Sequence, residues 1–175
     1  RGDKVLIFQT TIDHRAMTAL ARVNRKTLRR GSSFPVRTLA WFVAALELFL
    51  TATYLRGGHS GWQVNALLGL FMLGCLLTED RVNGLFALRR IPQNARAVNT
   101  VFQEESCYVC RTQAGENWWP YSSIRAAAET ERYFILMMDR THGQAYSKEG
   151  LSVGTPEEFR KLIQRKTGLK IQNIR

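Results

Sequence analysis

Two apolar runs separated by a very short connection constrain this chain more than any other feature. They cover residues 38–55 and 62–77, and the connection between them, residues 56–61, reads RGGHSG. A helix that crosses a bilayer needs ~20 mainly apolar residues, which both runs approach when they are extended to Phe34 and Thr78. Because so short a glycine-rich connection supports only a tight antiparallel turn, the sequence predicts a transmembrane helical hairpin over residues 34–78.

Basic residues flank both sides of this hairpin and predict its orientation, since Lys and Arg are retained on the cytoplasmic side of short loops. The connection contains only Arg56. The flanking basic residues are Arg22, Arg25, Lys26, Arg29, Arg30 and Arg37 before the first run and Arg81, Arg89, Arg90 and Arg96 after the second. We therefore expect a multi-pass protein of the cytoplasmic (inner) membrane with both termini in the cytoplasm.

Three polar residues within the runs leave room for other interpretations. Glu47, Gln63 and Asn65, together with the modest length of the runs, are compatible with a buried hairpin inside a soluble helical domain. In the membrane interpretation, which we favour, Glu47 is either a proton or ion site, a polar contact between subunits of a homo-oligomer, or a protonated carboxyl group bonded to Gln63, Asn65 or a backbone carbonyl. The last of these is preferred, because one carboxylate on two helices does not make a pathway.

The segment before the hairpin holds most of the formal net charge of +11. Residues 1–12 predict a strand, centred on KVLIFQTT at 4–11, and Asp13 can cap a basic amphipathic helix over residues 13–33. That helix can lie at the headgroup level and attract anionic lipid, or it can pack its apolar stripe on the cytoplasmic domain, and both roles can hold together. Its candidate lipid-facing residues are Arg22, Arg25, Lys26, Arg29 and Arg30. Charge concentrated at a membrane boundary also argues against a nucleic-acid partner, whose domain would carry its own basic face.

The segment after the hairpin changes from helical to β-type patterns. Residues 79–98 predict a helical exit and a connector, because Pro92 ends the helix, and residues 99–175 predict an antiparallel meander. The expected strands are residues 99–104, 107–112, 118–122, 126–131, 133–139 and 144–147. A closing helix is indicated by Thr155 as the cap, Pro156 at the first position, Glu158 three residues after the cap, and Gly168 as the stop. The expected fold class is α+β: a transmembrane hairpin with a cytoplasmic antiparallel β domain closed by a C-terminal helix.

The order of these parts resembles the YcxB-like family of bacterial membrane proteins. The local matches are Tyr121-Ser122-Ser123-Ile124, Glu129-Thr130, Tyr133-Phe134-Ile135-Leu136, Tyr146-Ser147-Lys148 and the capped helix at 155–163. The resemblance implies that the β domain is pleckstrin-homology-like (PH-like), and that residues 1–12 supply a strand that joins the sheet across the membrane insertion. It implies no activity for particular residues.

Residue patterns typical of catalysis or metal binding are weak here. Cys107 and Cys110 form a C-x-x-C pair, but on a strand residues three apart point to opposite faces, and we expect no metal, cofactor or enzymatic activity. Trp118 and Trp119 are a candidate partner-binding platform, although in such a pair one ring is more often in the core. Lys148 is a further candidate for partner binding, with a solvated turn lysine as the alternative.

These observations favour a non-enzymatic, membrane-anchored module whose cytoplasmic β domain binds a protein partner or anionic lipid headgroups. The alternative is a small immunity or stress factor, or a transporter-regulating subunit, that acts through the hairpin itself. Glu47, Gln63 and Asn65 would then be intramembrane contact residues.

Overall fold

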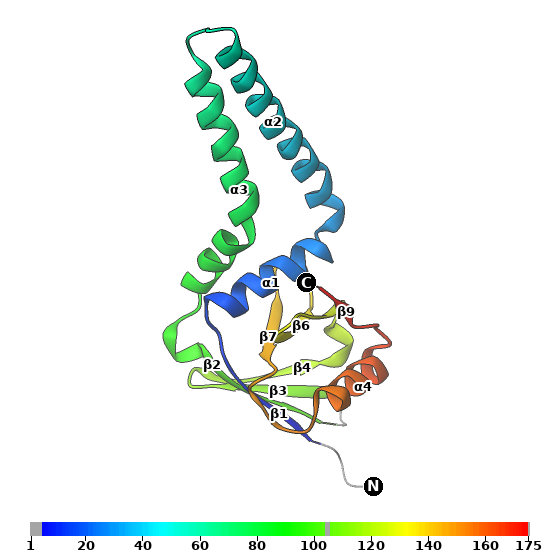
Figure 1. The fold of residues 1–175 in the computed structure, drawn as a ribbon. Coiled ribbons are helices and arrows are strands. Elements are labelled where there is room, and N and C mark those ends of the chain that lie inside the picture. Colours follow the sequence, from blue (N-terminus) through cyan, green and yellow to red (C-terminus); the bar gives the residue numbers. More distant parts are fainter. Residues whose placement is uncertain (1–4, 104–105, 175) are drawn as a thin grey trace. The chain divides into compact units, whose positions relative to one another are not determined.

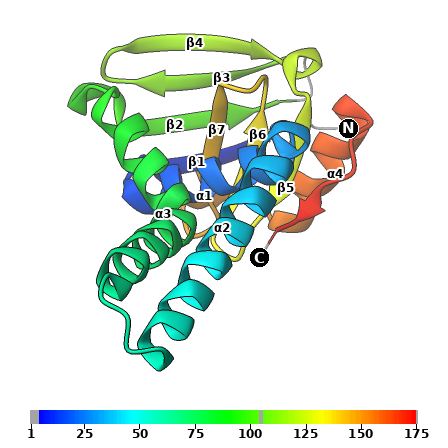
Figure 2. The same ribbon diagram turned by 90° about the horizontal axis from the view of Figure 1, so that it is seen from above.

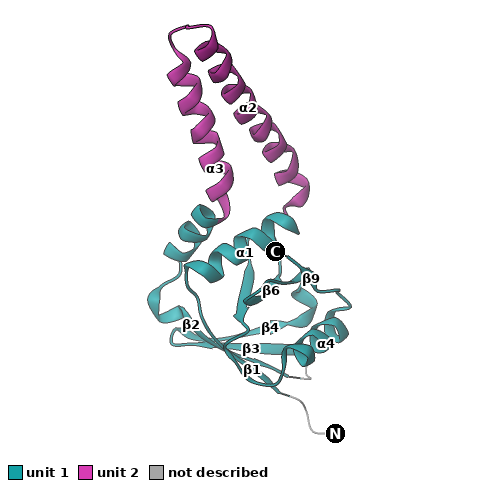
Figure 3. Ribbon diagram, in the orientation of Figure 1, with its two compact units in different colours: residues 1–28, 81–175 teal, residues 29–80 magenta. Residues whose placement is uncertain are grey.

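The computed structural model describes residues 5–103 and 106–174. The chain divides into a β unit, residues 1–28 and 81–175, and a hairpin unit, residues 29–80, which interrupts the β unit in the sequence (Figure 3). The helices are α1 (His14–Lys26), α2 (Arg30–Arg56), α3 (Trp62–Arg89) and α4 (Pro156–Thr167), with 3-10 turns at Gln93–Ala95 and Tyr121–Ser123. The strands are β1 (Leu6–Thr11), β2 (Ala97–Phe102), β3 (Cys107–Thr112), β4 (Gly115–Pro120), β5 (Ala126–Glu129), β6 (Tyr133–Met137), β7 (Gly143–Ser147), β8 (Leu151–Val153) and β9 (Gln172–Asn173).

The β unit contains two sheets. The first has the order β4-β3-β2-β1-β8 and the second the order β7-β6-β5-β9 (Figures 1 and 2). The strand β1 lies between β2 and β8, and its register pairs Leu6 with Phe102 and Thr11 with Ala97. The first strand of the chain is therefore paired on both sides with strands that follow the hairpin in sequence. All pairings are antiparallel except that of β5 with β9.

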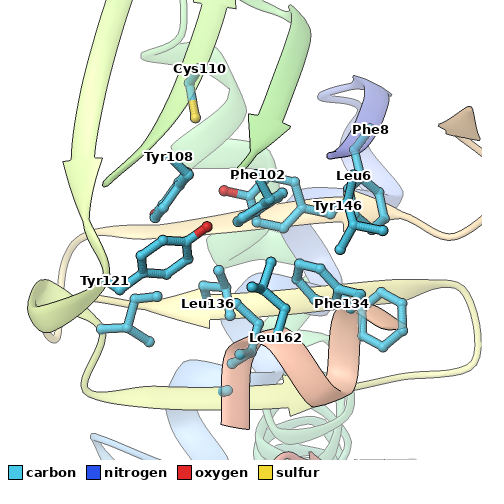
Figure 4. Close-up of a cluster of buried hydrophobic side chains, with 14 of the residues drawn as sticks. Leu6, Phe8, Phe102, Tyr108, Cys110, Tyr121, Phe134, Leu136, Tyr146 and Leu162 are labelled. Atoms are coloured by element: carbon cyan, nitrogen blue, oxygen red, sulfur yellow. The ribbon is translucent and has the colours of Figure 1, made fainter. Parts of the chain in front are cut away.

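The inner faces of the two sheets enclose an aromatic core (Figure 4). Phe8 on β1 is fully buried, and its ring contacts those of Phe102, Phe134, Tyr146 and Phe159 at centroid distances between 4.9 and 6.2 Å. Offset and edge-to-face aromatic pairs of this kind add to the stabilisation from burial. The core therefore ties β1 to strands and a helix from the C-terminal half of the chain.

The helix α4 closes one end of this core, and its sequence signals act as expected. Thr155 and Glu158 form a reciprocal capping box, Pro156 begins the helix, and Gly168 ends it with a positive φ of 70°. Such caps satisfy backbone groups that have no partner within the helix. Phe159, Leu162 and Ile163 are the buried residues of α4. The chemistry of both helix ends was thus readable from the sequence.

The helix α1 covers the outer face of the second sheet. Val23 is fully buried in a small cluster with Ala126, Ala128, Ile135 and Met137, and Ala19 and Leu20 pack against it. Asp13 caps α1 by accepting a hydrogen bond from the Ala16 amide at 2.7 Å. The apolar stripe of α1 therefore packs on the β unit, the second of the two roles considered from the sequence, and is not free to insert among lipid headgroups.

The hairpin unit consists of α2 and the part of α3 up to Asp80, joined by a short turn. Gly69 allows the two helices to approach closely, since a Cβ placed there would lie 3.1 Å from the Leu48 side chain. Arg37 of α2 forms an ion pair with Glu79 of α3. Both helices are long and apolar enough to cross a membrane. Only 6% of the most apolar 18-residue stretch of α2 and 11% of that of α3 is buried.

Several boundaries differ from the sequence prediction. The helix expected to reach residue 33 ends at Lys26, because the backbone of Thr27 leaves the helical region, with φ −111° and ψ −92°. The strand expected at 118–122 ends at Pro120, where the chain enters a 3-10 turn. β2 begins at Ala97, two residues earlier than predicted. The short strands β8 and β9 were missed, and with β1 inserted between β2 and β8 the β unit is not a simple meander.

Candidate functional site: a basic cavity beside α1

A cavity of about 840 Å³ opens on the β unit between α1, the last turns of α3 and the ends of β5, β6 and β7. It gathers more positive than negative side chains. The basic residues that line it are Arg15, Arg22, Arg81, Arg132 and Lys148, and the acidic residues are Glu129 and Glu131. Because this cavity combines a recess with a concentration of charged side chains, we take it as the candidate site.

Glu129 forms the structural base of the cavity. Its carboxylate accepts two hydrogen bonds of 2.8 Å from the Arg160 guanidinium and lies 2.6 Å from the Lys148 ammonium. The hydrogen bonds from Arg160, assisted by Lys148, lower the pKa of Glu129 to about 2. Lys148 and Arg160 also lie over the Phe134 ring, at 5.2 and 5.7 Å from its centroid. Glu129 therefore stays ionised and holds both cations in place at neutral pH.

Three of the arginines at the rim take no part in ion pairs of this kind. Arg15, Arg81 and Arg132 are exposed, and within the described part of the chain none of them forms a side-chain ion pair. Each guanidinium can donate two parallel hydrogen bonds to one phosphate or carboxylate group. The rim is therefore suited to an anion that carries several acceptor oxygens.

The arginines reach one rim because α3 is attached to α1. The His14 ring lies 3.2 Å from the Arg81 carbonyl. One turn later, Gly84 lies against the α1 backbone, where a Cβ would be only 2.7 Å from the Thr18 nitrogen. Any larger residue at position 84 would push the end of α3 away from α1. This glycine contact positions Arg81 opposite Arg15 and Arg22.

The candidate lipid-facing residues predicted from the sequence lie in different parts of the structure. Arg22 lines the basic cavity, whereas Arg25, Lys26 and Arg30 do not. Arg29 belongs to the hairpin unit, where it lines a separate recess of about 430 Å³ with Ser32, Ser33 and Arg37. Arg15, Arg81 and Arg132 were not proposed as site residues. Arg15 could have been found because it lies two helical turns before Arg22 on the same face, but Arg81 and Arg132 reach the cavity only through the tertiary fold.

Lys148, Trp118 and Trp119 lie in three different environments, so they do not form one shared binding platform. Lys148 is not a solvated turn lysine, because it is held by Glu129. Trp118 is 59% exposed, whereas Trp119, its neighbour on β4, packs against the aromatic core. Consecutive side chains of a strand point to opposite faces, so the two rings do not form one platform.

The polar residues of the hairpin unit do not meet as expected. Among the described residues, the Glu47 side chain has no hydrogen bond to Gln63 or Asn65. Glu47 lies beside Gly69, because a Cβ added to Gly69 would be 3.3 Å from the Cβ of Glu47. With Glu47 opposite Gly69, the antiparallel register places Gln63 and Asn65 one to two turns nearer the connecting loop. Among the described residues Glu47 therefore forms no carboxyl-to-amide bond, and its bond to a backbone carbonyl stays a prediction.

The cysteine pair of β3 is split as its spacing indicated. Cys107 is partly exposed and Cys110 is buried, and both are free thiols. Within the described ranges, no group of three or more His, Cys, Asp or Glu side chains could hold a metal ion.

Comparison of the chain with family models, with curated proteins and with solved structures gave no match. The interpretation of the site therefore rests on its own geometry.

Proposed function

We propose that this chain is a non-enzymatic integral membrane protein whose hairpin spans the cytoplasmic membrane and whose cytoplasmic β unit binds an anionic, phosphate-bearing lipid headgroup in the basic cavity. The observation that carries the proposal is the position of Arg15, Arg81 and Arg132 at the rim, where none of them forms a side-chain ion pair with a described residue. Arg81 follows Thr78, the end of the predicted span, by three positions. Three residues reach at most ~10 Å, so in this proposal the rim lies close to the headgroups.

The exposure of the hairpin helices supports membrane insertion. The most apolar stretch of each helix is almost entirely unburied, whereas the core helices of a soluble protein would be covered by other elements. Large apolar side chains such as Phe34, Phe42, Phe49, Leu67 and Phe71 are each more than 60% exposed. An apolar surface of this extent on a soluble protein would be a strong aggregation liability, whereas in a bilayer it faces hydrocarbon.

The architecture of the β unit supports a PH-like fold and membership of the YcxB-like family as part of the same proposal. Two mainly antiparallel sheets enclose one core, a single C-terminal helix closes one end, and β1 precedes the hairpin while its partners follow it. This is the order of elements on which the family resemblance rests.

The experiment titrates phosphatidylglycerol or phosphatidylcholine into the micelle-solubilised full chain and measures bound lipid by native mass spectrometry. We expect the anionic lipid to bind more tightly than the zwitterionic lipid. Each basic residue near an anionic headgroup contributes ~1 kcal/mol, so the double variant Arg15→Gln/Arg81→Gln should weaken that binding by roughly ten- to thirty-fold.

The matched control removes the same charge away from the cavity, as Arg125→Gln/Arg140→Gln. It should retain the preference for the anionic lipid. Equal loss in both double variants would mean that net charge alone attracts the lipid, and no loss in either would exclude the cavity as the binding site.

A further inference from the structure

A second cavity of the β unit, of about 580 Å³, lies where the first sheet, the edge strand β7 of the second sheet and α1 meet, and it differs from the basic cavity in its chemistry. Much of its wall is provided by Met17 and Leu20 of α1, Ile91 of the connector, Val98 of β2 and Trp119 of β4. No residue of the closing helix α4 lines it. Its volume falls in the range of cavities that hold small organic ligands.

Its inner end carries an ordered polar group. The side-chain oxygen of Gln144 accepts a hydrogen bond from the Tyr108 hydroxyl at 2.7 Å and a second from the Tyr146 hydroxyl. These two bonds fix which side of the carboxamide is the acceptor. The Gln144 amide nitrogen has no partner in the described part of the chain, and it is not fully buried. One hydrogen-bond donor is thus available to the cavity.

The other polar groups at this end are neutral. Burial raises the pKa of Tyr108, Cys110 and Tyr146 above their ordinary values. Cys110 accepts a hydrogen bond from Thr100 at 3.5 Å, and Figure 4 shows it at the end of the core away from Leu162. These groups therefore offer no charge to a ligand.

The charges of the lining residues indicate which net charge a ligand of this cavity can carry. Among the described residues that line the cavity, Glu116 is the only acidic one, and none is Lys, Arg or His. A carboxylate or phosphate would lose its hydration without gaining a cation. The occupant that fits this lining is uncharged and largely apolar, and it carries a hydrogen-bond acceptor.

We propose that this second cavity binds an uncharged acyl ester, of the class of monoacylglycerols, with the ester carbonyl accepting a hydrogen bond from the Gln144 amide and the acyl chain lying against Met17, Leu20 and Val98. This site is separate from the basic cavity, and it does not depend on the headgroup proposal.

The test uses the full chain in phospholipid nanodiscs with a monoacylglycerol that carries a photoactivatable diazirine in its acyl chain. The fatty acid with the same tagged chain is the second probe. After illumination, labelled peptides are identified by mass spectrometry. We expect the ester to label the segments around 17–20 and 91–98 at least five-fold more than the fatty acid does.

Two variants with one control locate the binding. Val98→Trp fills the cavity and should abolish this labelling, whereas Val101→Trp, on the opposite face of the same strand, should retain it. Gln144→Glu keeps the acceptor for both tyrosines but removes the donor, and should reduce labelling by the ester about ten-fold with an unchanged circular dichroism spectrum. Labelling confined to residues 38–55 and 62–77, labelling that survives Val98→Trp, or equal labelling by the fatty acid would overturn the proposal.

Discussion

The helix α1 and the two hairpin helices have apolar residues arranged in two different ways. α1 carries one apolar stripe, which the second sheet covers, so that Val23 is fully buried while Arg15 and Arg22 are exposed. α2 and α3 carry apolar residues on every side, and most of them have no protein neighbour to cover them. A stripe matches one protein surface, whereas an all-round apolar helix requires an apolar solvent or a partner. The same chain thus contains one helix whose apolar residues are covered by protein and two helices whose apolar residues are largely uncovered.

The largest expected effect separates these environments directly. Phe8→Ala should lower the free energy of unfolding of the β unit by about 3–5 kcal/mol, because it removes a ring at the centre of the aromatic core. Phe49→Ala, a change of the same side chain at a position 64% exposed, should alter the stability by no more than about 0.5 kcal/mol. Denaturant unfolding of the micelle-solubilised full chain, followed by aromatic circular dichroism, measures both. A large cost at Phe49 would show that α2 is covered by a second copy or another protein.

The next effect compares two glycines of α3. Gly84→Ala should destabilise the β unit by about 1–3 kcal/mol, because its Cβ would overlap the α1 backbone. Gly74 has open space within 4 Å, and Gly74→Ala should be neutral or slightly stabilising. Thermal unfolding of both variants tests the difference. If the two alanines have equal effects, the attachment of α3 to α1 does not position Arg81.

The ion pairs at the base of the cavity predict a pH dependence. The pKa of Glu129 is about 2 in the folded chain, below its ordinary value of 4.5, so its contribution is fully present at neutral pH and is lost as the pH falls from about 4.5 towards 2. Glu129→Gln should cost about 1–2 kcal/mol at pH 7, and the gap to the unmodified chain should close over that acidic range. Urea unfolding between pH 2 and pH 7 measures the gap.

The matched control for this pH dependence is Glu131→Gln, because Glu131 lines the same cavity but is exposed. It should show no comparable gap at any pH. A gap at Glu129 that persists at pH 2 would mean that the amide disturbs packing rather than charge.

Much of the fold could be predicted from the sequence because its signals are local. The caps of α4, the apolar runs and the β-type residues of β3 depend on neighbouring residues only, and they gave correct elements. The missed strands are short: β8 has three residues and β9 has two. Strands of that length form because a neighbouring edge offers hydrogen-bond partners, which no local pattern records.

The candidate site was less predictable because its residues come from five separated segments. The sequence indicated a basic helix, and Arg22 was assigned from it. Arg81 and Arg132 reach the cavity through the close contact at Gly84 and the pairing of β5 with β6. The pairing of Lys148 with Glu129 brings together positions from different strands. A single sequence contains no record of such contacts between distant residues.

The smallest expected effect concerns the ion pair of the hairpin unit and tests where the membrane boundary of the proposal lies. The side chains of Arg37 and Glu79 are 24% and 34% exposed. If they lie at the polar edge of the bilayer, water and salt screen them, and a double-mutant cycle with Arg37→Gln and Glu79→Gln should give a coupling of about 0.3–1 kcal/mol. The coupling should fall when NaCl is raised from 0.05 to 0.5 M, conditions that shorten the screening length. A coupling above about 2 kcal/mol that ignores salt would instead indicate a low-dielectric surrounding. The apolar layer would then extend beyond Thr78 to Glu79, and the arginine rim at Arg81 would lie at the hydrocarbon boundary rather than among the headgroups.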